Sequence, residues 1–154
     1  MSNLSALMVA VEAASRQRDA ARHALQTARQ VRQAALGQLD QLQAYAQETE
    51  SRWGARPDTA VQPEVMFHHY QFMGRLDHAA GMQKTVVEDR DLRVQRAERV
   101  LLDAELRLAS LRKVVEKRRQ DLAALQARRD QKQTDERAAL QYRHPVNGQG
   151  GQEH

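Results

Sequence analysis

Apolar residues recur at alternating steps of three and four along the first third of the chain. Counting from Leu4, the spacing selects Leu4, Leu7, Val11, Ala14, Arg18, Ala21, Leu25, Ala28, Arg32, Ala35, Leu39, Leu42, Ala46, Thr49 and Trp53. Only Arg18, Arg32 and Thr49 are polar in this set. A mean repeat of 3.5 residues keeps one stripe facing a partner helix and predicts a left-handed coiled coil. The many alanines predict closely spaced helices.

A second stripe with the same spacing begins just after Pro63. It comprises Met66, His69, Met73, Leu76, Ala80, Gln83, Val87, Arg90, Val94, Ala97, Leu101, Ala104, Leu108, Leu111, Val115, Arg118, Leu122, Leu125 and Arg129. Gly74 and Gly81 interrupt this helix, where each costs about 1 kcal/mol relative to alanine. We expect a bend or a close contact at these two glycines.

The segment between the stripes, Gly54 to Pro63, contains Pro57 as well as Pro63 and predicts a turn. The chain is therefore predicted to be all-α, an antiparallel two-helix coiled-coil hairpin with unequal helices. We expect a helix over about 4–53, a turn over about 54–63 and a helix over about 63–142. These form one hairpin over 1–142, followed by a flexible tail over 143–154. At 1.5 Å per residue the helices are about 75 Å and about 120 Å long.

The unequal lengths predict an overhang on the second helix. Antiparallel pairing would place Leu4 opposite a residue near 113, so the helix beyond that point would have no partner within the chain. That stretch still carries Val115, Leu122 and Leu125 at stripe positions, with many Lys and Arg residues around them. An exposed apolar stripe suggests a partner from another chain.

Composition supports a thin seam rather than a globular core, because 4% of residues are aromatic and 29% are charged. There is no cysteine, so neither a disulfide nor a thiolate metal site is expected. The start of the chain does not resemble a signal peptide, and no apolar run is long enough to span a membrane. The net charge of +4 leaves nucleic acid or an acidic protein surface as partners to consider.

Five of the six aromatic residues flank the predicted turn. They are Tyr45, Trp53, Phe67, Tyr70 and Phe72. For the group as a whole, packing in the core and contact with a partner are equally expected. Tyr45 and Phe72, however, fall outside both stripes, and exposed aromatics on the flank of a hairpin favour a protein contact.

The sequence offers no catalytic constellation, so we expect neither an enzyme nor a cofactor. His68, His69 and His78 with Asp77 could suggest a metal site, but the spacing puts them on different helical faces and no metal is expected. The basic overhang could contact phosphates. Its positive charges alternate with acids and lack a stacking aromatic, so nucleic-acid binding is the weaker alternative.

Four segments together resemble one protein family. They are Gln38-Leu39-x-x-Leu42-x-x-Tyr45-x-x-Glu48, Tyr70-x-Phe72-Met73-x-x-Leu76-x-x-Ala79-x-x-x-Gln83, Leu108-x-x-Leu111-Arg112-x-x-x-Glu116-Lys117-Arg118 and Gln131-Lys132-x-x-Asp135-Glu136-Arg137-Ala138. In order and spacing they resemble the FliJ family of the flagellar type III export apparatus over about residues 4–142. The resemblance implies a non-enzymatic two-helix coiled coil that serves flagellum biogenesis, protein transport and motility.

The resemblance also implies partners and binding residues. The helical termini of such a protein enter the hexameric flagellar export ATPase and promote its assembly or activity. Here that role falls on Leu4, Leu7, Val115, Arg118, Arg119, Leu122, Leu125, Arg128 and Arg129. The hairpin end contacts the export gate membrane protein FlhA through Gln38, Leu42, Tyr45, Phe72, Leu76 and Ala79. Export chaperones are further implied partners.

The implied location is the cytoplasm, in peripheral association with the cytoplasmic face of the inner membrane at the flagellar base. A generic coiled-coil adaptor or export chaperone without an ATPase contact is the alternative function.

Overall fold

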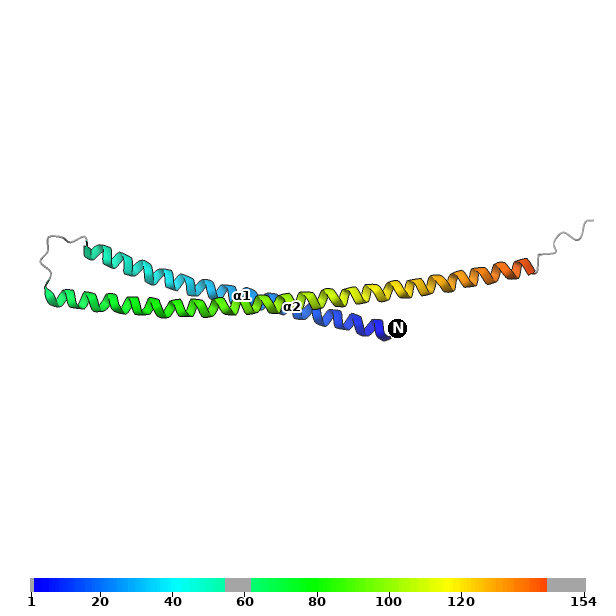
Figure 1. Ribbon diagram of the computed structural model, residues 1–154, viewed down its shortest axis with the longest axis horizontal. Helices are drawn as coiled ribbons and strands as arrows, with labels where there is room; N and C mark the ends of the chain where they lie inside the picture. Colours follow the sequence, from blue (N-terminus) through cyan, green and yellow to red (C-terminus); the bar gives the residue numbers. More distant parts are fainter. Residues whose placement is uncertain (1, 55–61, 144–154) are drawn as a thin grey trace, which may run out of the picture. The chain divides into compact units, whose positions relative to one another are not determined.

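Two long α-helices make up nearly all of the residues that the computed structural model describes, which are 2–54 and 62–143 (Figure 1). Helix α1 spans Ser2–Gly54 and contains 53 residues, and helix α2 spans Pro63–Arg143 and contains 81 residues. These described ranges contain no strand. The predicted all-α hairpin with unequal helices is confirmed.

Proline and its neighbours define the start of α2. Pro63 occupies the first helical position, where the missing N–H would have had no intrahelical acceptor. The backbone N–H of Met66 donates to the Gln62 carbonyl at 3.1 Å, which closes the first turn. Glu64 in that turn places a negative charge at the positive end of the helix dipole.

The expected helices over 4–53 and 63–142 fall within α1 and α2. Of the expected turn over 54–63, residues 55–61 lie outside the described residues. Residues 144–154 of the expected tail also lie outside the described residues. Arg143 was expected in the tail, but it is the last residue of α2. A single hairpin over 1–142 stays a prediction.

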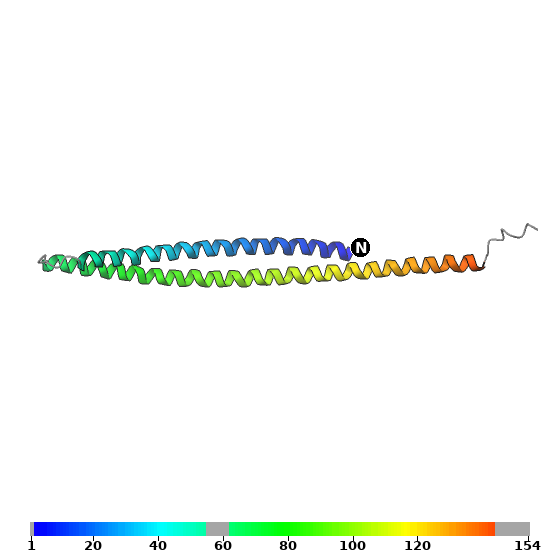
Figure 2. The same ribbon diagram turned by 90° about the horizontal axis from the view of Figure 1, so that it is seen from above.

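The helices contribute to two compact units. Residues Ala14–Arg107 form the first, which we call the hairpin unit. The described parts of Met1–Ala13 and Leu108–His154 form the second, which we call the terminal unit. In the hairpin unit, α1 and α2 run antiparallel and side by side in both views (Figures 1 and 2).

The predicted stripes form the seam of the hairpin unit. Each stripe position from Ala14 to Trp53 on α1, and from His69 to Ala104 on α2, is buried or half-buried. The most enclosed is Val94, with 1% of its surface exposed. Leu25 and Ala35 are 6% and 5% exposed. Burial of a valine or leucine side chain stabilises a fold by about 1.5–3 kcal/mol, so the seam is the main source of pairing energy.

The two arginines in the α1 stripe keep their guanidinium groups at the edge of the seam. The Nη1 of Arg32 donates to Asp91 across the helices at 3.2 Å, and the Nε of Arg18 donates to Asp19 at 2.8 Å. Their aliphatic stems can therefore cover the seam while the terminal nitrogens reach partners. The Nε of Arg32 is buried and has no hydrogen-bond partner among the described residues.

In the terminal unit, α1 covers more of α2 than the sequence predicted. Val115, expected within the overhang, is 8% exposed and lines a pocket with Met8, Val11 and Arg119. The placement of Leu4 opposite a residue near 113 is therefore wrong, because Met8 already lies near Val115 and Arg119. The offset depends on the conformation of the connection between the helices, which the heptad pattern does not specify.

Gly74 and Gly81 lie on an exposed side of α2. A methyl group at either position would meet no other atom within 4 Å. The expectation of a close contact at these glycines within the chain is therefore wrong.

Candidate functional site: two interaction surfaces

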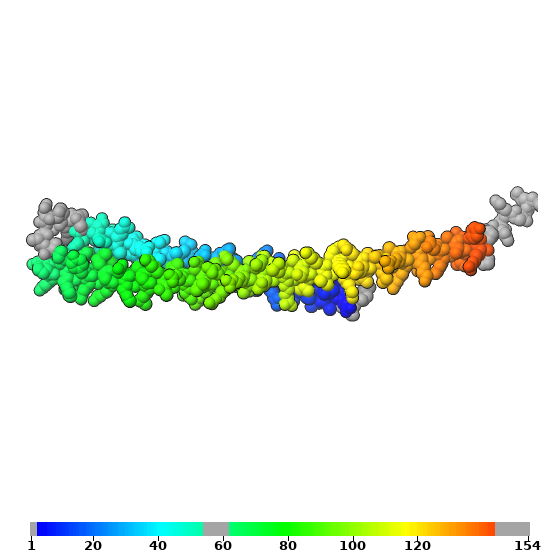
Figure 3. Space-filling model, in the orientation of Figure 1, coloured from blue at the N-terminus to red at the C-terminus, as the bar shows by residue number. Residues whose placement is uncertain are grey.

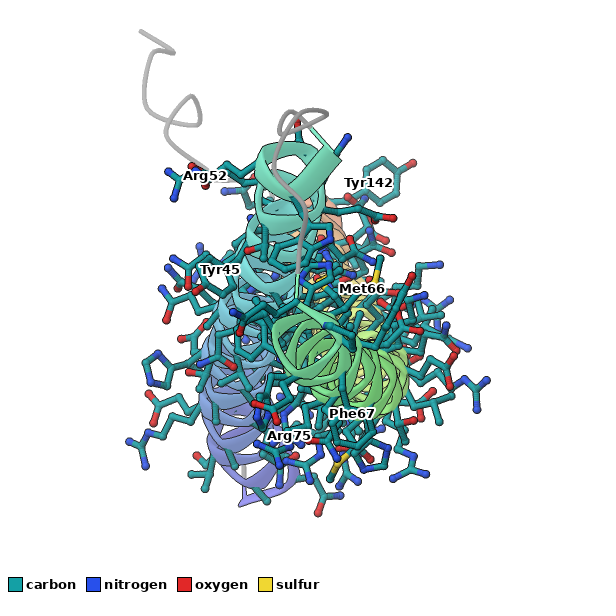
Figure 4. The ribbon with its side chains drawn as sticks, turned by 90° about the vertical axis from the view of Figure 1, so that its left-hand side faces the viewer. Tyr45, Arg52, Met66, Phe67, Arg75 and Tyr142 are labelled. Atoms are coloured by element: carbon teal, nitrogen blue, oxygen red, sulfur yellow. The ribbon has the colours of Figure 1, made fainter. Side chains whose placement is uncertain are left out.

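The described residues offer two surfaces for partners, one in each unit. In the hairpin unit, Tyr45 of α1 and Phe72 of α2 meet edge to face, with ring centroids 6.1 Å apart and planes at 86°. Tyr45 is 52% exposed and Phe72 is 39% exposed. Tyr45 lies on the flank of α1 in the end-on view of Figure 4. The rings thus bridge the two helices and still present apolar area to a partner.

A glutamine at a stripe position connects this surface across the seam. The Gln83 Nε2 donates to the Ala35 carbonyl at 2.9 Å and to the Gln38 Oε1 at 3.1 Å. The first bond fastens α2 to the backbone of α1, and the second orients the exposed Gln38 side chain. The sequence predicted a stripe position for Gln83 without a hydrogen-bonding role. A polar residue at a stripe position signals such a role, but its hydrogen-bond partners depend on the offset between the helices.

The other predicted gate-contact residues lie deeper. Leu42, Leu76 and Ala79 are half-buried, beside the more exposed Gln38, Tyr45 and Phe72. All six belong to the hairpin unit, and the structure brings Tyr45 and Phe72 into direct contact. The half-buried members would support the exposed ones, so fewer side chains are available to a partner than the sequence suggested. Gate binding by this group stays a prediction.

The remaining aromatics near the break separate into two kinds. Trp53 and His69 stack with centroids 4.0 Å apart and planes at 4°, which covers this end of the seam. Phe67 and Tyr70 are 58% and 66% exposed, and Figure 4 shows Phe67 on the flank of α2. Trp53 and His69 therefore pack on each other at the seam, whereas Phe67 and Tyr70 stay exposed.

The histidines near the break do not form a metal centre in the part of the chain that the structure describes. No group of three or more His, Cys, Asp or Glu residues is placed to hold an ion there. The His69 ring is engaged by Trp53 instead.

The second surface is the overhang of α2 in the terminal unit. Every residue from Glu116 to Arg143 is exposed. In Figures 1 and 2 the orange to red part of α2 has no other described segment beside it, and Figure 3 shows it as a single-helix surface. Leu122 and Leu125, at stripe positions, are 41% and 45% exposed. The stripe therefore continues past the last turn that α1 covers.

The predicted ATPase-contact residues lie on both sides of the point where α1 stops covering α2. Leu4 and Leu7 are half-buried and Val115 is buried, so these three belong to the seam. The members that remain exposed are Arg118, Arg119, Leu122, Leu125, Arg128 and Arg129. The available surface is thus two leucines surrounded by arginines. Its contact with an ATPase stays a prediction.

None of the helices in the described ranges is both long and apolar enough to cross a membrane. Two long helices paired along one apolar seam define a coiled-coil hairpin protein. The chain belongs to the FliJ family, because the protein-family model described as "Flagellar FliJ protein" matches residues 4–147. No significant match was found among curated proteins or solved structures.

Family membership makes the chain a component of the flagellar protein export apparatus. The FliJ family is a non-catalytic component of that apparatus. The resemblance noted in the four sequence segments is confirmed.

Proposed function

We propose that the chain is the coiled-coil stalk of the flagellar export ATPase. In this proposal the overhang of α2 enters the hexameric ATPase ring and promotes its assembly or activity. This proposal rests on the observation that every residue of Glu116–Arg143 is exposed, although Leu122 and Leu125 continue the apolar stripe there. A long helix without tertiary packing is marginally stable in water, so this stretch gains most from a partner.

The charges around this stripe argue against pairing with a second copy. In an antiparallel pair centred on Leu122 and Leu125, Arg118 of each copy would lie opposite Arg129 of the other. In a parallel pair each arginine would face the same arginine of the other copy. Like charges directly opposed destabilise a helix pair, so a partner that presents acidic or neutral groups fits better.

We further propose that the surface around Tyr45 and Phe72 contacts the membrane export gate FlhA. Half-exposed aromatic rings held by packing against each other lose little side-chain freedom when a partner covers them. Protein contacts often depend on such anchors. This contact would place the protein peripherally at the cytoplasmic face of the inner membrane, and export chaperones are further proposed partners.

Replacing both Tyr45 and Phe72 with alanine should weaken binding to the cytoplasmic part of FlhA about tenfold or more. The physical reason is the loss of two anchors, each of which contributes more than about 1 kcal/mol at typical interfaces. Helicity should change little, because both rings lie outside the seam. Calorimetric titration and circular dichroism give the two readouts.

The matched control replaces Phe67 and Tyr70, which are also exposed aromatics of the hairpin unit but do not bridge the helices. This variant should bind the gate as the native chain does. Equal weakening by both pairs would show that any loss of aromatic surface suffices. A large loss of helicity in the Tyr45/Phe72 variant alone would assign those rings to the core.

A further inference from the structure

The two edges of the hairpin unit differ in how the helices are joined. Along one edge, three ion pairs cross from α1 to α2. They are Arg22–Glu105 at 4.0 Å, Arg29–Glu98 at 3.7 Å and Arg32–Asp91 at 3.2 Å. From the first pair to the second, both partners shift by seven residues in opposite directions. This edge is therefore covered by long side chains that neutralise one another.

Between Ala20 and Gln38, the opposite edge has no charged residue on α1. From Ala20 to Gln38, the exposed positions adjacent to the seam are Ala20, Ala24, Thr27, Val31, Ala34 and Gln38. Val31 is 41% exposed. Short side chains leave a groove of about 340 Å³ between the helices, lined by Ala24, Thr27, Ala28, Val31, Arg90 and Arg93. The edge is thus open where the other is covered.

The charge of the groove comes from α2. Arg90 and Arg93 share a single carboxylate, that of Asp89, at 2.6 Å and 3.1 Å. On the same edge of α2, at seven-residue intervals, lie Ala79, Val86, Arg93, Val100 and Arg107, with no acid among them. The groove therefore combines an uncharged, narrow side on α1 with a net positive side on α2.

We propose that this open edge is a docking groove for a third helix, supplied by a different protein. Its occupant is an amphipathic helix with small and medium aliphatic residues facing α1 and with Asp or Glu on the flank that faces Arg90 and Arg93. Alanine-lined surfaces permit the close approach of a packed helix, at an axial distance of about 8–10 Å. Acidic residues would complete the charge pairing that α1 leaves open.

The size of the edge fits such an occupant. Ala20 to Gln38 covers about 27 Å at 1.5 Å per residue, the length of a helix of about 18 residues. A second copy of this chain fits poorly. Its exposed stretch, Glu116–Arg143, carries more Lys and Arg than Asp and Glu, so it would bring like charge to Arg90 and Arg93.

The groove goes beyond the proposed function, because neither the overhang nor the Tyr45–Phe72 surface requires it. It lies on the same edge as Tyr45 and Phe72 but involves a different stretch of both helices.

The test uses two synthetic fluorescent peptides of about 20 residues, designed as amphipathic helices. Both carry Ala and Leu on one face, and the flanking positions are Glu in one and Lys in the other. Fluorescence anisotropy with the full chain at low salt should show that the Glu peptide binds at least about tenfold more tightly, a difference of about 1.4 kcal/mol. Added salt should reduce that preference.

Two substitutions locate the binding. Arg93→Glu should reverse the preference in favour of the Lys peptide, and Ala24→Gln should weaken both peptides by filling the groove. The controls are Arg99→Glu and Ala44→Gln, which are exposed positions on the sides of the helices away from the seam and outside the groove lining. They should leave binding unchanged.

Absence of binding, equal binding of both peptides, or insensitivity to Arg93→Glu and Ala24→Gln would overturn the proposal. Sedimentation of the chain alone gives a further readout. A dimer that Ala24→Gln dissociates would identify the occupant as a second copy and would also contradict it. Because no ATPase or gate protein is present, failure here leaves the proposed stalk function untouched.

Discussion

Replacing Val94 with aspartate should destabilise the hairpin unit by about 3 kcal/mol or more. Val94 is the most enclosed side chain of the seam, with 1% exposure. The substitution forfeits about 1.5–3 kcal/mol of apolar burial and adds the desolvation of a carboxylate. Urea unfolding followed by far-ultraviolet circular dichroism measures the change.

The same replacement at Val100 is the control, because that valine of α2 is 58% exposed. An exposed substitution of this kind usually changes stability by less than about 0.5 kcal/mol, apart from a small loss of helix propensity. Similar losses at Val94 and Val100 would mean that the helices do not pair through the predicted stripes.

Replacing both Leu122 and Leu125 with aspartate should abolish stimulation of the export ATPase while the hairpin stays folded. Both leucines are exposed in the chain alone, so their loss removes little internal packing. In the proposed complex they would be covered, and two carboxylates would then be desolvated without a partner. The measurement is ATP turnover by the purified ATPase with and without the variant, beside an unfolding curve of the variant.

The matched control replaces Leu102 and Leu106, which are 54% and 58% exposed in the hairpin unit. This control variant also gains two aspartates, but outside the overhang, and it should still stimulate the ATPase. If the Leu122/Leu125 variant stimulates as well as this control does, insertion of the overhang is wrong.

Periodicity predicted most of the residues that form the seam, although Met66, the first predicted stripe position of α2, is 40% exposed. From Ala14 to Trp53 each predicted α1 position is at least half-buried, and the polar Arg18 and Arg32 fit because their stems lie along the seam. A heptad pattern succeeds here because a two-helix pair has only one apolar interface to fill. The flank positions of Tyr45 and Phe72 followed from the same counting.

The offset between the helices was not predictable in this way. A heptad pattern is unchanged by a shift of seven residues, and it does not specify the conformation of the connection between the helices. The shift decides that Val115 is covered while Leu122 is exposed. It also decides which charges meet, so the pairing of Arg29 with Glu98 and the unpaired character of the opposite edge required the structure.

Polar contacts within the seam escaped the sequence for a related reason. Gln83 bonds Ala35 and Gln38 only because the observed offset places those residues opposite it. With another offset, the same glutamine would be a destabilising polar residue in an apolar interface.

We propose above all that this chain is the stalk of the flagellar export ATPase. The most direct measurement mixes the purified full chain with the purified ATPase from the same cell and follows both the mass of the complex and ATP turnover. We expect a hexameric ATPase that retains this chain and hydrolyses ATP faster than the ATPase alone. An ATPase whose assembly and turnover are both unchanged by the chain would contradict it.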